Sequence, residues 1–298
     1  MTSARGQSKA RRGAKAAWQT GFLHKNVRMG LSININATAP DSLGIAEIET
    51  LVRRWHSLAQ TFASEGLIKK VHGMSNKHDD LDRFASRYVS IPHPDDPDTI
   101  TGVSVPPTEG WMFIASIGEG CEPLMLGFCR YPKFVSTRNG NGGGRKQLPT
   151  GAGTGWHFQT SCKTQYASTR GWEHFRRCHV AIIELAAAAE SLGATVRIDD
   201  EGGWWPGRDD TALRRTLSRY NTLMAGLAGA LKDSLDEDNT TPENNDGTGN
   251  TGASNRAPLH AAIFEHPDFE RLEAESQSGG DSAKILEALR KIRGSLEQ

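Results

Sequence analysis

Alternation of apolar and polar residues marks the strands expected in this chain. From Leu31 to Asn36 every second residue is apolar, a pattern typical of a strand that buries one face. Two later apolar runs are joined by the sequence GEGCEP, a connection of the length found in hairpins. The expected strands are 31–36, 111–117, 124–131 and 195–199, with a short one near 88–91 inside the proline-rich stretch 72–109.

Apolar residues spaced three and four apart predict three long helices and a short one. Asp or Ser residues are expected to cap the N-terminal ends of two of these helices, and a Gly residue is expected to end another. The predicted helices are 42–64 with Asp41 or Ser42 as N-cap, 171–192 followed by Gly193, 209–235 with Asp209 as N-cap, and 282–296.

The stretch WHFQTSCKTQY, residues 156–166, carries polar side chains along one whole face of a predicted strand. With a period of two, Trp156, Phe158 and Cys162 point to one side, which we expect to be the core. The other side offers an imidazole, two amides, a hydroxyl and an ammonium group, on His157, Gln159, Ser161, Lys163 and Gln165. This variety favours a surface that recognises a ligand; the alternative is an ordinary solvated sheet face.

The order strand, helix, strands, helix, strand, helix predicts an α+β fold. We expect a mainly antiparallel sheet with helices packed on one face, as a ferredoxin-like plait or a related sandwich. The second sheet face is then free, and the polar residues of 157–165 are expected there. Lys163 and Glu201 are expected on this same side within reach of one ligand, because a right-handed crossover returns beside its first strand or one strand away.

The segment DDEGGWW, residues 199–205, is a second candidate site. Its glycines allow a sharp turn or a close approach to a ligand, and its tryptophans offer flat apolar faces, so Trp204 is a candidate ligand contact. Asp199 and Glu201 are expected on the free face, where carboxylates act as acid or base or bind a hard cation. The alternative is a plain turn with solvated acids and tryptophans that cap the core.

A third cluster lies at the start of the predicted helix 171–192. His174 and Arg177 share one helix face, where they either hold an anion or are solvated. Cys178 falls on the apolar face and is expected to be a core thiol, while His179 is expected to be a buried histidine bonded to a carbonyl group. The spacing of cysteines and histidines matches no common zinc pattern, so no metal site is predicted.

Charge is balanced over the whole chain but not along it. The 35 basic and 35 acidic residues cancel, which argues against a protein that is basic throughout and wraps nucleic acid. Residues 1–29 form a basic arm, for which a weak phosphate contact stays open. The expected core domain spans 30–235 with a glycine-rich loop at 138–155, and an acidic disordered linker, 236–257, leads to a C-terminal segment, 258–298.

Apolar segments are too short for a membrane protein. A bilayer crossing needs about 20 apolar residues, and the basic N-terminal stretch is not followed by the apolar segment of a secretion signal. The four cysteines form no CxxC pair, which suits free thiols in a reducing compartment. We therefore expect a cytoplasmic protein without a membrane partner.

Three segments, SCKTQYAS, FRRCH and DEGGWWPGRD, resemble a family of uncharacterised bacterial proteins that carry CKTQYA, F-x-RCH and DEGG-x-W. The similarity runs from Trp156 to about Lys232. The resemblance implies a bacterial source and a shared core or site, and it brings no activity with it.

These features predict binding of a small polar or anionic ligand on the free sheet face. In a hydrolytic enzyme His157, Asp199 and Glu201 would act as acid, base or cation ligand. The expected ligand contacts are Lys163, Gln165, His174, Arg177 and Trp204. The alternative is a non-catalytic module whose same face meets a protein partner or a second copy of the chain. No motif identifies a cofactor.

Overall fold

Six antiparallel strands form the central sheet of the protein. The computed structural model describes residues 31–93, 96–138, 145–151, 154–240, 263 and 266–278. The strands follow the order β10-β1-β9-β6-β5-β2, and each pairing is antiparallel. They are β1 (Ser32–Ala39), β2 (Lys70–Val71), β5 (Glu109–Ser116), β6 (Leu124–Arg130), β9 (Trp156–Lys163) and β10 (Thr195–Asp200).

The connections between these strands are those of a ferredoxin-like plait. The helix α1 (Ile45–Ser64) follows β1, and α3 (Trp172–Ala187) leads from β9 to β10. The α3 crossover leaves one strand in the gap, because β1 lies between β9 and β10. After α1 the chain enters the sheet at β2, at the far edge, and returns through β5 to β6, which is separated from β1 by β9 alone. This arrangement confirms the predicted α+β fold with a mainly antiparallel sheet.

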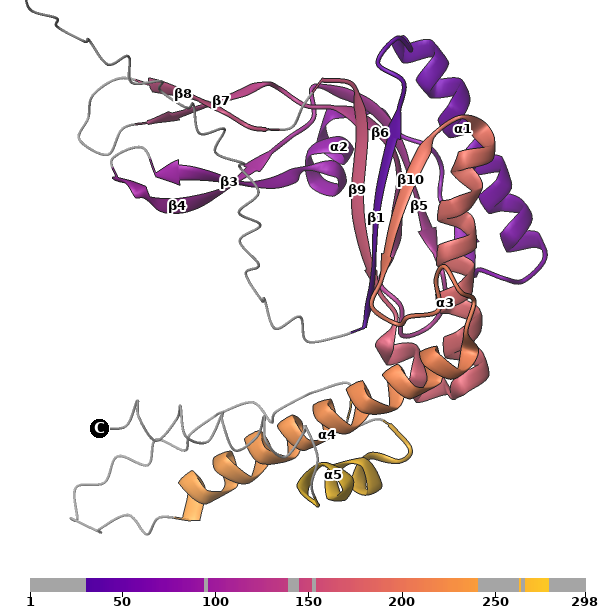
Figure 1. Ribbon diagram of the computed structural model, residues 1–298, viewed down its shortest axis with the longest axis vertical. Coiled ribbons are helices and arrows are strands. Elements are labelled where there is room, and N and C mark those ends of the chain that lie inside the picture. The colour runs from indigo at the N-terminus through magenta and orange to yellow at the C-terminus, as the bar shows by residue number, and fades with distance from the viewer. Residues whose placement is uncertain are drawn as a thin grey trace, which may run out of the picture.

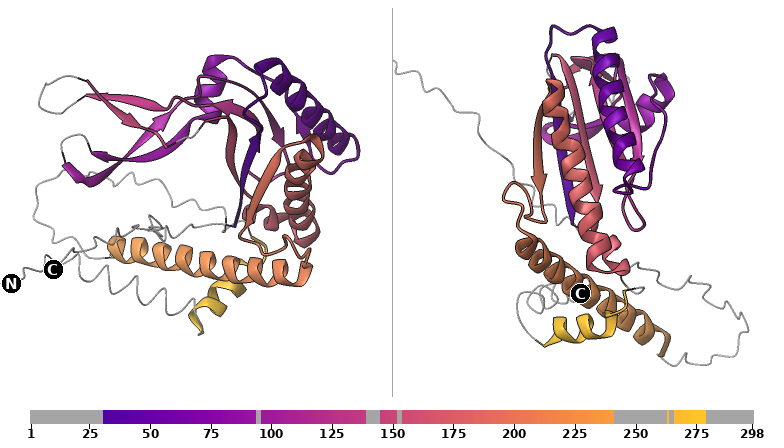
Figure 2. Two further views of the ribbon diagram at one scale, coloured as in Figure 1. Left: turned by 45° about the horizontal axis from the view of Figure 1, so that its top comes forward. Right: turned by 90° about the vertical axis from the view of Figure 1, so that its right-hand side faces the viewer.

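The helices α1 and α3 cover one face of the sheet, as Figure 1 and the right-hand view of Figure 2 show. In the core between them and the sheet, Trp55 packs against Phe113 and Phe128, with ring centroids 6.1 and 5.8 Å apart. The indole nitrogen of Trp55 donates to the carbonyl oxygen of Leu185 at 2.8 Å and so ties α1 to α3. This face is filled by apolar side chains and offers no room for a ligand.

The opposite face of the sheet is covered only in part. The helix α2 (His78–Ala85) lies on that side against β5 and β6 (Figure 1). Met112 alternates with Phe113, points to the side of α2 and is 2% exposed. On β10, β1 and β9, by contrast, most side chains that point to this side are exposed or half-buried. We call this part of the sheet the open face.

Two further hairpins project from the sheet (Figure 1). The strand β3 (Arg87–His93), which includes the short strand expected near 88–91, pairs with β4 (Asp96–Val105). The strand β7 (Phe134–Arg138) pairs with β8 (Arg145–Pro149). The second of these strands lies inside the stretch 138–155, which was expected to be a loop. That expectation was wrong for β8, because Leu148 is buried opposite Val135 and anchors a strand there.

The end of the predicted helix 171–192 agrees with the sequence pattern, whereas the N-cap of α1 does not. Its N-cap is Gly44, and neither Asp41 nor Ser42 caps it. The Glu47 carboxylate accepts the N–H of Gly44 at 2.7 Å, whereas Asp41 accepts the hydroxyl of Thr154 at 3.1 Å. The predicted helix 171–192 is α3 followed by the 3-10 segment η2 (Ala188–Leu192). Gly193 ends it as expected, in the left-handed conformation at φ 94°.

The helix α4 (Asp210–Thr240) runs beyond its expected end, so the first residues of the expected linker 236–257 are helical. The helix α5 (Phe269–Gln277), which was not predicted, packs on α4 around Ala225, Ala228, Ile263 and Leu272. The arm 1–29, the rest of the linker and the helix expected at 282–296 lie outside the described residues. No helix in the described part of the chain has both the length and the apolar character that crossing a membrane requires.

Candidate functional site

The polar residues of β9 lie on the open face beside those of β1 and β10. Trp156, Phe158 and Cys162 are buried on the side of α1 and α3, as expected. Because residues that pair across antiparallel strands point to the same side, the polar side chains form rows. From β10 through β1 to β9, these rows are Thr195–Thr38–His157, Arg197–Asn36–Gln159 and Asp199–Asn34–Ser161, followed by Ser32–Lys163.

The two middle rows form what we call the central patch: Asn34, Asn36, Gln159, Ser161, Arg197 and Asp199. Neighbours lie about 5 Å apart across strands and about 7 Å apart along a strand. All but the half-buried Asn34 are exposed. None of the six side chains has a hydrogen-bond or ion-pair partner among the described residues, and that includes the buried Nδ2 of Asn34.

His157 and Lys163 stand at opposite ends of the open face. Nε2 of His157 lies 2.9 Å from the carbonyl oxygen of Thr154, and Nζ of Lys163 lies 4.0 Å from a carboxylate oxygen of Glu122. Six positions along an extended strand span about 20 Å. One small ligand therefore cannot contact both ends.

Lys163 and Glu201 lie on the same side of the sheet, with Ser32 between them. The Glu201 carboxylate accepts the backbone N–H of Ser32 at 3.0 Å and its hydroxyl at 2.6 Å. Two strand spacings separate the backbones of Lys163 and Glu201, about 10 Å. A ligand that touches both would have to bridge Ser32, and Glu201 is already engaged.

Gln165 does not belong to the open face, and its expected position there was wrong. It follows β9 in the 3-10 segment η1 (Gln165–Arg170) and is 1% exposed. Its Oε1 accepts the N–H of Leu31 at 3.3 Å, and its Nε2 donates to Oδ1 of Asn221 at 3.4 Å. The strand ends at Lys163, so the alternation that was read through to Gln165 no longer applies.

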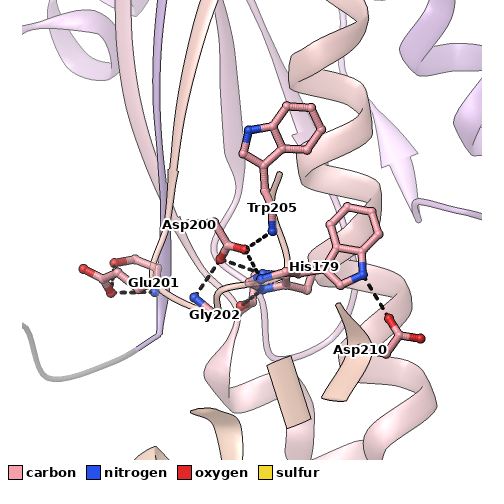
Figure 3. Close-up of polar contacts among 9 residues, drawn as sticks. His179, Asp200, Glu201, Gly202, Trp205 and Asp210 are labelled. Atoms are coloured by element: carbon pink, nitrogen blue, oxygen red, sulfur yellow. Dashed lines mark hydrogen bonds and ion pairs between the residues drawn. The ribbon is translucent and has the colours of Figure 1, made fainter. Parts of the chain in front are cut away.

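The segment 199–205 is organised by the carboxylate of Asp200 (Figure 3). This side chain is fully buried and accepts the backbone N–H groups of Gly202, Trp204 and Trp205 at 2.7, 2.7 and 2.9 Å. Nε2 of His179 donates a fourth hydrogen bond at 2.9 Å. Burial acts to raise the pKa of Asp200, but these donors outweigh it and hold the pKa below its ordinary value. Asp200 is therefore an anion that shapes the turn.

Asp200 and Glu201 point to opposite sides of the strand end, as Figure 3 shows. On the side of Asp200, Nδ1 of His179 lies 2.9 Å from Oγ1 of Thr164. The side chains of Thr164, His179 and Asp200 are all fully buried, and they join the end of β9 to α3 and to the turn. The burial expected for His179 is confirmed, with a hydroxyl and a carboxylate as its partners in place of a carbonyl group. No substrate can reach this set of groups.

Trp204 lies in the core and is 4% exposed, so its flat face is not free for a ligand. Its Nε1 donates to Oδ1 of Asp210 at 2.9 Å, and the other oxygen of that carboxylate accepts Nε of Arg176 at 2.6 Å. Trp204 therefore caps the core, which is the alternative given above for the tryptophans of this segment.

His174 and Arg177 lie on the helix side of the sheet, away from the central patch. Nη2 of Arg177 donates to Nδ1 of His174 at 3.1 Å, and Nε2 of His174 donates to the carbonyl oxygen of Glu119 at 2.9 Å. Nη1 of Arg177 donates to the carbonyl oxygen of Gly66 at 2.8 Å. These bonds tie α3 to the turn between β5 and β6 and to the connection between α1 and β2. Cys178 is fully buried, which confirms the core thiol.

The open face also contains residues that the sequence analysis did not select. Asn34, Asn36 and Arg197 complete the central patch. Asn34 and Asn36 lie in the alternating stretch 31–36, and Arg197 lies in the expected strand 195–199. These patterns predicted the strands but not which strands are neighbours in the sheet. Within the described ranges, no three His, Cys, Asp or Glu side chains are grouped so that they could hold a metal ion.

A scan against protein-family models, a search of curated proteins and a search of solved structures each found no match. The resemblance carried by the CKTQYA, F-x-RCH and DEGG-x-W segments stays a prediction.

Proposed function

We propose that the protein binds a small polar ligand, hydroxylated or anionic, on the central patch of its open face. One observation carries this proposal: six hydrogen-bonding side chains in two adjacent rows lack a partner in the described part of the protein. Three of them are amides: those of Asn36 and Gln159 are exposed and offer both a donor and an acceptor, whereas the Nδ2 of Asn34 is buried.

The six side chains supply complementary groups. The amides of Asn34, Asn36 and Gln159 match ligand hydroxyl groups, which also donate and accept. Arg197 can hold a carboxylate or phosphate group through two parallel hydrogen bonds. The Asp199 carboxylate accepts hydrogen bonds from hydroxyl groups and repels anions. An anionic group of the ligand is therefore expected at the row that contains Arg197.

The size of the open face favours a small ligand over a protein partner. Four rows across three strands measure about 10 by 20 Å, or about 200 Å². A stable protein interface buries about 800 Å² on each partner. A protein partner, or a second copy of the chain, would therefore need surface beyond the open face.

The positions of the acidic and basic groups favour binding over hydrolysis. General acid–base catalysis requires both groups within hydrogen-bond reach of the same substrate atoms. His157 and Asp199 lie two rows apart, and Glu201 is bonded to Ser32. We therefore assign no reaction to these residues.

We further propose that binding takes place in the bacterial cytoplasm. The resemblance implies the bacterial source, and four free cysteines suit a reducing compartment. A nucleic-acid contact by the basic arm 1–29 stays a prediction about residues outside the structure's described ranges.

An NMR titration tests the proposed binding, because the side-chain amides of Asn34, Asn36 and Gln159 report directly on it. Three probes separate the chemistry: gluconate carries hydroxyl groups and a carboxylate, sorbitol only hydroxyl groups, and acetate only a carboxylate. We expect gluconate to shift these amide resonances saturably, with a Kd at least about ten-fold below that of either other probe, since two kinds of contact act together.

The double variant Asn36→Ala, Gln159→Ala should weaken gluconate binding about ten-fold or more, as two hydrogen bonds are removed. Gln60→Ala is the matched control, because this exposed amide lies on α1. The proposal fails if no probe shifts the three amides, or if the double variant binds gluconate like the wild type.

A further inference from the structure

The strand β10 forms one edge of the central sheet, as the right-hand view of Figure 2 shows, and no described strand pairs with its outer side. It runs along β1 for six residues without a bulge. At the opposite edge, β2 has only two residues. Short strands, bulges and prolines protect a sheet edge from pairing with another chain. The strand β10 has none of these three protections.

The hydrogen bonds to β1 show which backbone groups of β10 face the free edge. The N–H of Glu201 donates to the carbonyl oxygen of Ser32 in β1 at 3.1 Å. Along a strand the backbone groups of successive residues point to opposite edges, so every second residue back from Glu201 also faces β1. The N–H and C=O groups of Val196 and Ile198 therefore face outward, where the described part of the sheet offers them no strand.

The side chains of β10 leave apolar and charged surface beside these backbone groups. Arg197 and Asp199 point to the open face and are exposed. Val196 and Ile198 point to the helix side, where they contact the core but stay half-buried. By contrast, Ile35, which pairs with Ile198 from β1, is 1% exposed. A further strand at the edge would bury more of both apolar side chains.

We propose that β10 pairs with β10 of a second copy of the chain, antiparallel about a two-fold axis at Ile198. The two sheets would then join into one. Two side chains of opposite charge, one on each side of Ile198 in the sequence, are the observation that carries this proposal. It goes beyond ligand binding on the central patch and does not depend on it.

With the axis at Ile198, unlike charges lie opposite each other. Arg197 faces the partner's Asp199, and Asp199 faces the partner's Arg197. Because the backbone groups of these residues point to β1, the two pairs take the positions without hydrogen bonds across the new edge, where Cα atoms lie about 4.5 Å apart and side chains are closest. Opposite charges at such positions stabilise a strand pair.

The neighbouring symmetric registers place like charges opposite each other. An axis at position 197 would set Arg197 against the partner's Arg197, and an axis at position 199 would set Asp199 against the partner's Asp199. Like charges directly opposite each other destabilise a strand pair. Charged side chains of one sign often protect an edge, whereas these two opposite signs select one register.

The pairing would extend the open face and leave it able to bind a ligand. The rows of the central patch that end at Arg197 and Asp199 would continue into the rows of the second copy. Arg197 has five N–H donors, so an ion pair with one carboxylate leaves donors for an anionic ligand group. Dimer formation and ligand binding are therefore compatible and can be measured separately.

The shared edge is short, so the dimer is expected to be weak. Six strand residues span about 20 Å, and the surface they bury is far below the roughly 800 Å² per partner of a stable interface. In pairing of this kind the main-chain hydrogen bonds supply much of the affinity. We expect a dimer Kd of about 10 to 100 µM.

Sedimentation velocity of the full chain without ligand tests the pairing over a concentration series that spans this Kd. We expect monomer at low concentration and a reversible dimer at high concentration, weakened by added salt because exposed charges are screened. Arg197→Asp and Asp199→Arg each set like charges opposite each other at both pairs. Each should raise the dimer Kd at least about ten-fold.

Mixing these two variants gives the sharpest test, because a chain with two acids then faces a chain with two bases. The mixture should form a heterodimer with a Kd within about three-fold of that of the wild-type dimer. Arg54→Glu is the matched control, since it reverses an exposed charge on α1. It should dimerise like the wild type.

Hydrogen exchange of the wild type, followed by NMR, tests the same register without any substitution. The amides of Val196 and Ile198 should exchange more slowly as the protein concentration rises, because the second copy accepts their hydrogen bonds. Urea midpoints measured at low concentration check that the charge variants fold. The proposal is overturned if the wild type stays monomeric, if exchange at these two amides does not depend on concentration, or if folded single variants dimerise like the wild type.

Discussion

Asp199 and Asp200 are adjacent in the chain and lie in opposite environments. The first is exposed on the open face without a partner among the described residues, and the second is buried with four hydrogen-bond donors around it. An amide at position 200 would replace one acceptor oxygen with a donor group that faces other donors. The two acids thus provide a test pair in which only the surroundings differ.

We expect Asp200→Asn to lower the free energy of unfolding by about 3 kcal/mol, because it removes a buried carboxylate that accepts four hydrogen bonds and leaves donors unsatisfied. Asp199→Asn should change it by less than about 0.5 kcal/mol. Urea denaturation at neutral pH measures both. The folded-state pKa of Asp200 lies below its ordinary value, so the gap in free energy of unfolding between wild type and Asp200→Asn should stay constant above about pH 5.

As the pH falls further, through the folded-state pKa, the carboxylate of the wild type takes up a proton and the gap should close. Equal losses of stability in the two variants would contradict the role given to Asp200. A gap that stays open in acid would show that the charge of this carboxylate is not what stabilises the turn.

The residue pattern identified the segment 199–205 but pointed to Asp199 and Glu201 as its important acids, whereas Asp200 organises the turn. Period-two alternation placed Asp199 and Glu201 on the open face, where the structure has them. It said nothing about Asp200, because the alternation assigns a residue to a side without showing what it meets there. His179 and the turn's own N–H groups become its partners only when α3 folds back onto β10.

Among the elements, α3 shows why helical periodicity was a good guide. Phe175, Cys178 and Ile182 are buried at the spacing that the sequence displays. Helical periodicity also found α1 and α4, while apolar alternation and short apolar runs found the five longer strands of the sheet. These patterns missed α2, α5, β2, β4, β7 and β8, which are short elements or lie in the two projecting hairpins.

Ile182→Ala should lower the free energy of unfolding by about 2 to 5 kcal/mol, because it leaves a cavity under α3 where the side chain is 0% exposed. The exposed Arg215 on α4 is a suitable control, and Arg215→Ala should cost less than about 0.5 kcal/mol. Arg214 is a poorer choice, since its guanidinium lies 4.4 Å from the ring centroid of Trp172. Similar losses in the Ile182 and Arg215 variants would mean that the buried side of α3 is assigned incorrectly.

The whole molecule contains two apolar clusters of very different size. The large one joins the sheet to α1, α2, α3 and the first part of α4, whereas a small one joins the later part of α4 to α5 through Ala225, Ala228, Ile263 and Leu272. A cluster with so few buried side chains is expected to open at a lower free energy than the main core. Helical periodicity predicted α4 but could not assign its partner, because the partner α5 was not predicted.

Leu272→Ala should therefore raise the rate of amide hydrogen exchange in α5 without moving the urea midpoint of the main unfolding transition. Ile182→Ala should lower that midpoint as well. Hydrogen exchange followed by mass spectrometry, together with the denaturation curve, distinguishes the two. A shift of the main transition by Leu272→Ala would show that the clusters unfold as one unit.

The position of β1 between β9 and β10 has a consequence for synthesis on the ribosome. Leu31 is bonded to a residue 134 positions later, and Ser32 to one 169 positions later. At about 5 to 20 residues per second, the first of these partners emerges roughly 7 to 27 seconds after β1. For that time β1 has two unpaired edges, and such edges favour aggregation. We therefore expect the nascent chain to aggregate less when a chaperone shields β1 until the second half of the plait has left the exit tunnel.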